Sequence, residues 1–261
     1  GAFGSGAGSP FTLMMNHELG ATAGVVRAHG QTGSFVSRWQ INPDLSVASG
    51  RDQNTSAADA YEWTGAGWSN APGVEQRWAR FCSSDLAGTS AFQWTDPGSG
   101  ASFGTTDRIL LNGEENGNEG RAYAHVAGGA ELYTTWRLPH LGRTSWENAL
   151  AAPLSQRKTV VMGMDDSTPG ATSHGSVLMY VGDKQASGNT IERAGLTNGN
   201  LYSLRVAGFQ NESRASVPAP SRFDFYNHGN VANVSGSTID ADGFANGASN
   251  FLRPEDGAWD A

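Results

Sequence analysis

The stretch that decides the fold runs from Asp107 to Leu138 and reads DRILLNGEENGNEGRAYAHVAGGAELYTTWRL. It contains three short runs with apolar or alternating residues, at positions 107–111, 121–126 and 131–138. Asn112-Gly113 and Gly128-Gly129 follow the first two runs, and such dipeptides are typical of turns. The stretch therefore predicts neighbouring β-strands joined by short, glycine-rich connections.

Working outward, most of the remaining chain shows the same pattern. Similar runs occupy positions 11–15, 33–41, 158–163, 176–181, 200–206 and 221–226. Strong helical periodicity is nearly absent, and only Trp146 to Leu154 is expected to form a helical turn or two. Positions 53–75, rich in Ala, Ser, Thr, Asn and Gly, predict a long loop. Many short strands with glycine-rich turns indicate an all-β sandwich, barrel or propeller.

Composition narrows the class of protein. The 261 residues include 35 Gly, a single Cys and 16% charged residues, and this low charge excludes a coiled coil. Eight Trp, eleven Phe and six Tyr supply enough apolar surface to exclude a disordered chain. No apolar run is long enough for a transmembrane helix. A net charge of −8 argues against nucleic-acid binding and suits cations such as calcium.

Acidic and amide side chains collect just after the predicted strands. They are Asn16-His17-Glu18, Glu114-Glu115, Glu147, Asp165-Asp166 and Arg253-Pro254-Glu255-Asp256. Hard cations need several oxygen ligands at once, so convergent strand ends of this composition predict a cation site. Each cluster also has an ordinary structural interpretation as a solvated turn, an Asx turn or an ion pair. The single Cys82 would then be a small buried apolar residue.

Five motifs follow one another along the chain. They are Cys82 in Arg80-Phe-Cys-Ser-Ser84, Glu114 and Glu115 in Asn112-Gly-Glu-Glu-Asn116, Gly142-Arg143 with Glu147, Gly163 with Asp165-Asp166, and Arg253-Pro254-Glu255. In this order the sequence resembles the PhoX-type alkaline phosphatase family. It is most similar to a secreted bacterial subgroup with Asn-His-Glu-Leu near the start and Arg-Pro-Glu-Asp-Gly-Ala-Trp-Asp later.

The resemblance implies a β-propeller whose central metal cluster of calcium and iron binds phosphate. Carried over by position, Cys82 would be a thiolate ligand to iron. The carboxylate and calcium ligands would come from Glu114, Glu115, Glu147, Asp165, Asp166 and Glu255. Arg253 would hold phosphate oxygens, and Arg253 and Glu255 are the residues that the resemblance implies for catalysis.

The sequence also departs from the family pattern. Cys82 lies 32 residues before the glutamate pair, and Gly113 rather than a cysteine precedes that pair. The family continues for further strands beyond Ala261. We therefore expect one propeller-like domain over residues 1–261 that is a fragment of a longer chain, completed by a C-terminal part or by another chain.

Three functional hypotheses follow. The first is a secreted or periplasmic phosphoric ester hydrolase that uses calcium and iron on a phosphate ester. The second is an extracellular or cell-surface protein that calcium stabilises and that performs no catalysis. The third is a β-sandwich module that binds carbohydrate through some of its eight Trp residues.

Overall fold

The computed structural model describes residues 8–71, 76–167, 170, 173–215 and 221–260. Three sheets dominate the fold. The first is antiparallel and consists of β1 (Phe11–His17), β2 (Phe35–Ile41) and β3 (Val47–Asp52). The second has the order β5-β4-β11-β10-β9-β6, with β4 (Ala60–Trp63), β5 (Trp68–Ser69), β6 (Phe81–Asp85), β9 (Ile109–Glu114), β10 (Ala122–Val126) and β11 (Thr135–Arg137).

The third sheet is an antiparallel series of five consecutive strands. It contains β12 (Trp146–Ala151), β13 (Lys158–Asp165), β14 (Val177–Asp183), β15 (Asn200–Val206) and β16 (Phe223–Gly229). A separate hairpin joins β7 (Gln93–Thr95) and β8 (Ser102–Gly104). The helical segments are η1 (Ala57–Asp59), η2 (Thr89–Ala91), η3 (Pro139–Leu141), α1 (Thr190–Arg193) and α2 (Gly236–Ala245).

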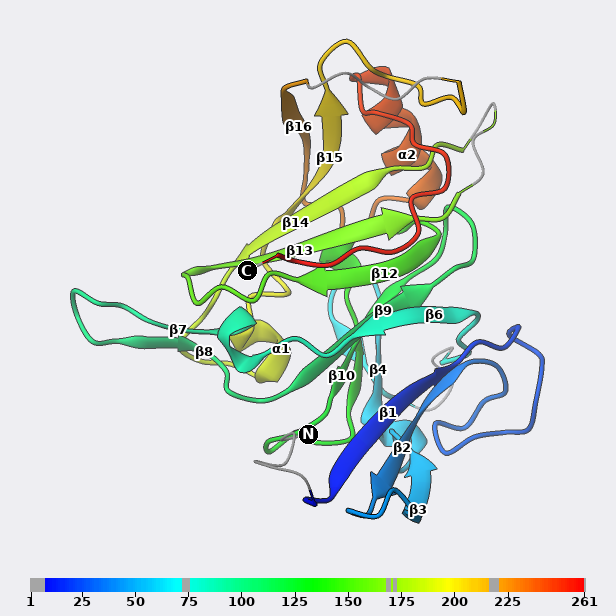
Figure 1. Cartoon of the computed structure of the whole chain (residues 1–261), viewed down its shortest axis with the longest axis vertical. Helices are drawn as coiled ribbons and strands as arrows, with labels where there is room; N and C mark the ends of the chain where they lie inside the picture. The colour runs from blue at the N-terminus through cyan, green and yellow to red at the C-terminus, as the bar shows by residue number, and fades with distance from the viewer. Residues whose placement is uncertain (1–7, 72–75, 168–169, 171–172, 216–220, 261) are drawn as a thin grey trace.

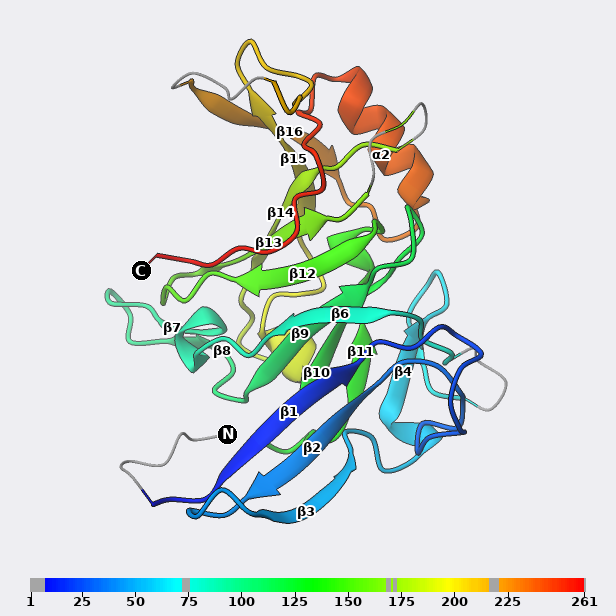
Figure 2. The same cartoon turned by 45° about the vertical axis from the view of Figure 1, so that its right-hand side comes forward.

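The second sheet lies between the other two, as Figures 1 and 2 both show. All six residues of β9 and all five of β10 are buried. Leu110 and Tyr123 pack in a cluster with Val36 of the first sheet, whereas Ile109 and Leu111 pack with residues of the third sheet. Burial on both faces explains why the decisive stretch contains continuous apolar runs.

The all-β prediction is confirmed, and the several antiparallel sheets are consistent with an incomplete propeller-like fold. The helical prediction for 146–154 is wrong, because Trp146–Ala151 pairs with β13 as strand β12. The loop prediction for 53–75 is wrong in part, since β4 and β5 lie within it. The pattern also missed α2, whose sequence GSTIDADGFA has no clear apolar stripe.

Two glycines of the motifs are required by packing. An added Cβ at Gly113 would lie 2.4 Å from the Cβ of Trp146, and one at Gly163 would lie 2.2 Å from its ring. Both strands must therefore approach this buried tryptophan without a side chain of their own. None of the helices in the described ranges is long and apolar enough to span a membrane.

Candidate functional site

Three side chains of the predicted site meet at the ends of three strands. Cys82 comes from β6, Glu115 directly follows β9, and Glu147 is the second residue of β12. The sulfur of Cys82 and one carboxylate oxygen from each glutamate all lie within 4.8 Å of one another. Each of the three residues is half-buried. The fold thus assembles a thiol and two carboxylates from segments that are far apart in the sequence.

A β-bulge positions Glu147 in this cluster. The register of β12 against β13 shifts between Trp146 and Asn148, so Glu147 is an extra residue in the strand. Its Oε1 accepts hydrogen bonds from the Cys82 thiol at 3.1 Å and from the Ser83 hydroxyl at 3.2 Å. Bulges of this kind redirect a side chain beside a functional site.

The electrostatics of the cluster keep the thiol protonated when no cation is bound. Burial, the hydrogen bond to Glu147 and the charges of Glu147, Glu18 and Glu115 together raise the pKa of Cys82 to about 12. Burial also raises the pKa of Glu147, against the hydrogen bonds from Cys82 and Ser83. The two carboxylates of the cluster, Glu115 and Glu147, favour a bound cation as their counter-charge.

Arg253 lies at the edge of the same cluster. Its Nε and Nη2 donate to the two carboxylate oxygens of Asp166 at 2.6 and 2.7 Å, and Nη2 lies 3.3 Å from Glu255. The hydrogen bond and the charge of Asp166 raise the pKa of Arg253, to which the charges of Glu255 and Glu115 also contribute. Its backbone adopts a φ of 56°, an uncommon left-handed conformation for a non-glycine residue.

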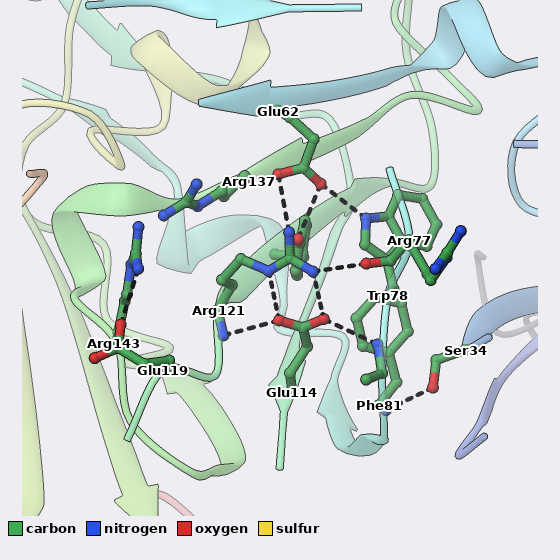
Figure 3. Close-up of polar contacts among 12 residues, drawn as sticks. Ser34, Glu62, Arg77, Trp78, Phe81, Glu114, Glu119, Arg121, Arg137 and Arg143 are labelled. Carbon is green, nitrogen blue, oxygen red and sulfur yellow. Dashed lines mark hydrogen bonds and ion pairs between the residues drawn. The ribbon is translucent and has the colours of Figure 1, made fainter. Parts of the chain in front are cut away.

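The structure does not bring Glu114 to the cluster. This residue is 1% exposed and accepts hydrogen bonds from Nε and Nη2 of Arg121 at 2.6 and 2.7 Å and from the backbone N–H of Ala79 at 2.9 Å (Figure 3). Glu114 therefore holds the loop before β6 against β9. Its neighbour Glu115 points the other way, because successive side chains of an extended chain alternate between faces.

Asp165 and Asp166 likewise have different partners. Asp165 is 2% exposed and accepts a hydrogen bond from the Ser167 hydroxyl at 2.7 Å, whereas Asp166 holds Arg253. Burial raises the pKa of Asp165 to about 6, although hydrogen bonds from Ser167 and Thr144 oppose this shift. Glu114 and Asp165 are thus buried structural groups, whereas Glu115 and Asp166 lie at the candidate site, although Asp166 is buried as well, at 8% exposure.

Sequence reasoning missed Arg80 as part of the site. Its Nη2 lies 2.6 Å from Glu115 and 3.3 Å from Glu18, and its φ of 52° is again left-handed. Asn16 supports the site from behind, since its side chain donates to the backbone carbonyl of Cys82 at 2.6 Å. The signal was present: Asn16-His17-Glu18 follows a strand, and Arg80 lies two residues before Cys82.

No protein-family model matches the sequence, and no curated protein does. Among solved structures, the chain is similar to "Pseudomonas fluorescens PhoX in complex with vanadate, a transition state analogue", at 14% sequence identity and a TM-score of 0.46. The similarity covers 97% of this chain and 54% of that chain, so the present sequence spans about half the length of that structure.

Proposed function

We propose that the chain is a metal-dependent phosphoric ester hydrolase with Cys82, Glu115 and Glu147 as its metal centre. The observation that carries the proposal is their convergence within 4.8 Å from three separate strands. The ordered motifs that resemble the PhoX-type phosphatases support it, because all five contribute a residue to this cluster or to the ion pairs beside it.

The donor set fits a transition metal better than an alkaline-earth ion. A thiolate with two carboxylates suits iron, whereas calcium takes oxygen ligands. We therefore assign iron to the Cys82 cluster and calcium to oxygen ligands beside it, with Asp166 and Glu255 as the candidates. A cation would lower the pKa of Cys82 from about 12, so that metal binding would release the thiol proton.

Arg253 and Glu255 would act on the substrate. The planar fork of Arg253 holds the Asp166 carboxylate through two N–H groups, and two phosphate oxygens would take the place of that carboxylate when substrate binds. Glu255 lies 3.3 Å from this fork, and its side chain is more than half exposed. It can therefore accept a proton from a group that reacts with the bound phosphate ester. Bound metal would supply charge neutralisation and a water of lowered pKa.

The test is hydrolysis of 4-nitrophenyl phosphate by protein loaded with iron and calcium. Turnover should disappear on chelation, return with metal, and fall at least about 100-fold in Glu255→Ala, the scale of a lost acid–base group. Arg205→Gln is a matched control, because Arg205 forms an exposed ion pair with Asp224. Absence of turnover by the fully loaded protein would overturn the proposal.

A second candidate function is that of an extracellular or cell-surface protein that calcium stabilises and that catalyses no reaction. It is favoured by the engagement of Arg253, whose Nε and Nη2 both face carboxylates. This function predicts that calcium alone raises the melting temperature, by the equivalent of about 2.7 kcal/mol at 100-fold over Kd. Calcium stabilisation without turnover in the iron-loaded protein would select it over the hydrolase.

We retain two further proposals about the whole molecule. One is a secreted or periplasmic location, which the low lysine content supports, with two Lys beside fifteen Arg. The other is a single propeller-like domain over residues 1–261 that additional strands complete.

A further inference from the structure

Three arginines gather around a second set of acidic side chains, apart from the residues of the proposed metal centre (Figure 3). Arg121 holds Glu114 through two hydrogen bonds. Arg143 donates from Nη1 to Glu119 at 2.8 Å. The third, Arg137, lies on β11 beside them. Two of the three guanidinium groups thus have a carboxylate of their own.

Arg137 lacks such a partner. It is 8% exposed, and its Nη1 donates only a long hydrogen bond of 3.4 Å to the backbone carbonyl of Trp63. Its Nη2 is buried and has no hydrogen-bond acceptor, and the described ranges contain no ion pair of Arg137. A buried charged donor without a partner is costly, so native proteins pair such groups with an ion or with ordered water.

The nearby Glu62 does not neutralise Arg137. Its Oε1 accepts hydrogen bonds from Trp78 Nε1 at 2.8 Å and Tyr123 Oη at 2.9 Å, and its Oε2 lies 3.6 Å from Arg121. Burial raises the pKa of Glu62, and the charge of Arg121 and the hydrogen bonds from Trp78 and Tyr123 oppose this shift. Glu62 therefore forms no hydrogen bond or ion pair with Arg137 among the described residues.

The surroundings of Arg137 strengthen this conclusion. Burial lowers its pKa; Tyr123 and Glu62 oppose the shift, and the positive charges of Arg143 and Arg121 add to it. Figure 3 shows the side chains of Arg137 and Arg143 in the same group. About a third of the Arg143 side chain is exposed, so solutes can reach Arg143 itself. An anion between these side chains would offset the repulsion of Arg137 by Arg143 and Arg121. It would also accept a hydrogen bond from Nη2 of Arg137.

We propose that Arg137 and Arg143 bind a small oxyanion, with inorganic phosphate as the simplest representative. Guanidinium groups suit such ligands because their planar N–H pairs match the oxygens of phosphate and carboxylate groups. The site gives a role to the arginine of the Gly142-Arg143 motif, which the proposed metal centre does not use. It is independent of that centre and needs no metal.

The test is calorimetric titration of inorganic phosphate into chelator-treated protein, with ionic strength held constant by chloride. We expect one phosphate per chain in the wild type and at least a 10-fold larger Kd in Arg143→Gln. Arg157→Gln is the matched control, because Arg157 is similarly exposed and stacks on Phe103. Arg143→Gln changes a side chain that is about a third exposed, so it is the primary variant, and Arg137→Lys is the second.

Each outcome decides the proposal. Saturable binding that Arg143→Gln weakens and Arg157→Gln preserves supports it. Acetate binding with the same dependence on Arg143 also supports it and extends the ligand class to carboxylates. No saturable binding, or equal affinity in Arg143→Gln and the wild type, overturns it. Loss of binding in Arg253→Gln instead would assign the phosphate to the proposed catalytic site and would likewise overturn it.

Discussion

The adjacent glutamates Glu114 and Glu115 provide the most discriminating mutational test. The structure places Glu114 in a buried ion pair with Arg121 and Glu115 in a half-exposed one with Arg80. We predict that Glu114→Ala destabilises the protein strongly but leaves metal affinity unchanged. Glu115→Ala should do the reverse, because it removes one of three ligands and no core contact.

The magnitudes follow from what each substitution leaves behind. Truncating Glu114 leaves Arg121 with the Arg77 carbonyl at 2.7 Å and with Glu62, at 3.6 Å, as its one remaining carboxylate among the described residues; breaking a buried pair in this way costs about 3–5 kcal/mol. The remaining carboxylate places the expected loss near the lower value, about 3 kcal/mol. Truncating Glu115 removes a pair whose arginine is nearly half exposed, which costs about 0–1 kcal/mol.

Urea denaturation followed by tryptophan fluorescence measures the free energy of unfolding, and metal titration measures the affinity. Glu119→Ala is a matched control on the same loop, since Glu119 is 45% exposed and pairs with Arg143. It should cost no more than about 1 kcal/mol. A loss below about 1 kcal/mol in Glu114→Ala, or equal losses in the two adjacent variants, would refute the assignment of roles.

Three further predictions concern core packing, the pH dependence of stability, and the effect of Arg80 on metal affinity. Gly163→Ala should destabilise the fold by about 1–3 kcal/mol, because the new Cβ would meet the Trp146 ring at 2.2 Å; unchanged urea denaturation would contradict this. Burial lowers the pKa of His125 to about 3, so the neutral form is favoured on folding and stability is lost as pH falls below 6.5. Between pH 7 and 4.5 the wild type should therefore lose about 2–3 kcal/mol more than His125→Asn, and parallel pH profiles would disprove it. Arg80→Gln should tighten metal binding up to about 5-fold in calorimetry, since the guanidinium competes for Glu115; weaker binding would show that Arg80 only supports the fold.

The strands were predictable where one pattern dominates, and the errors have physical causes. The runs at 158–163, 176–181 and 200–206 lie within β13, β14 and β15, apart from Ser176 just before β14. Positions 146–154 misled the prediction because a β-bulge at Glu147 breaks the alternation that marks a strand. Helix α2 escaped notice because Gly and Ser replace an apolar stripe.

The site was predictable as a set of residue types but not as a set of contacts. Cys82, Glu115 and Glu147 meet as the motif order suggested. Whether the first or the second member of an acidic pair faces the candidate site depends on the register of the strand that precedes it, which sequence alone does not fix. The unpaired Nη2 of Arg137 became visible only when its neighbours were placed around it.

The measurement that tests the central claim most directly is elemental analysis of the purified protein beside its Glu147→Gln variant. The proposed metal centre predicts iron together with calcium in the wild type and a clear loss of iron in the variant, with the fold intact by circular dichroism. Wild-type protein that contains neither metal after incubation with both, or equal iron in the two proteins, would contradict it.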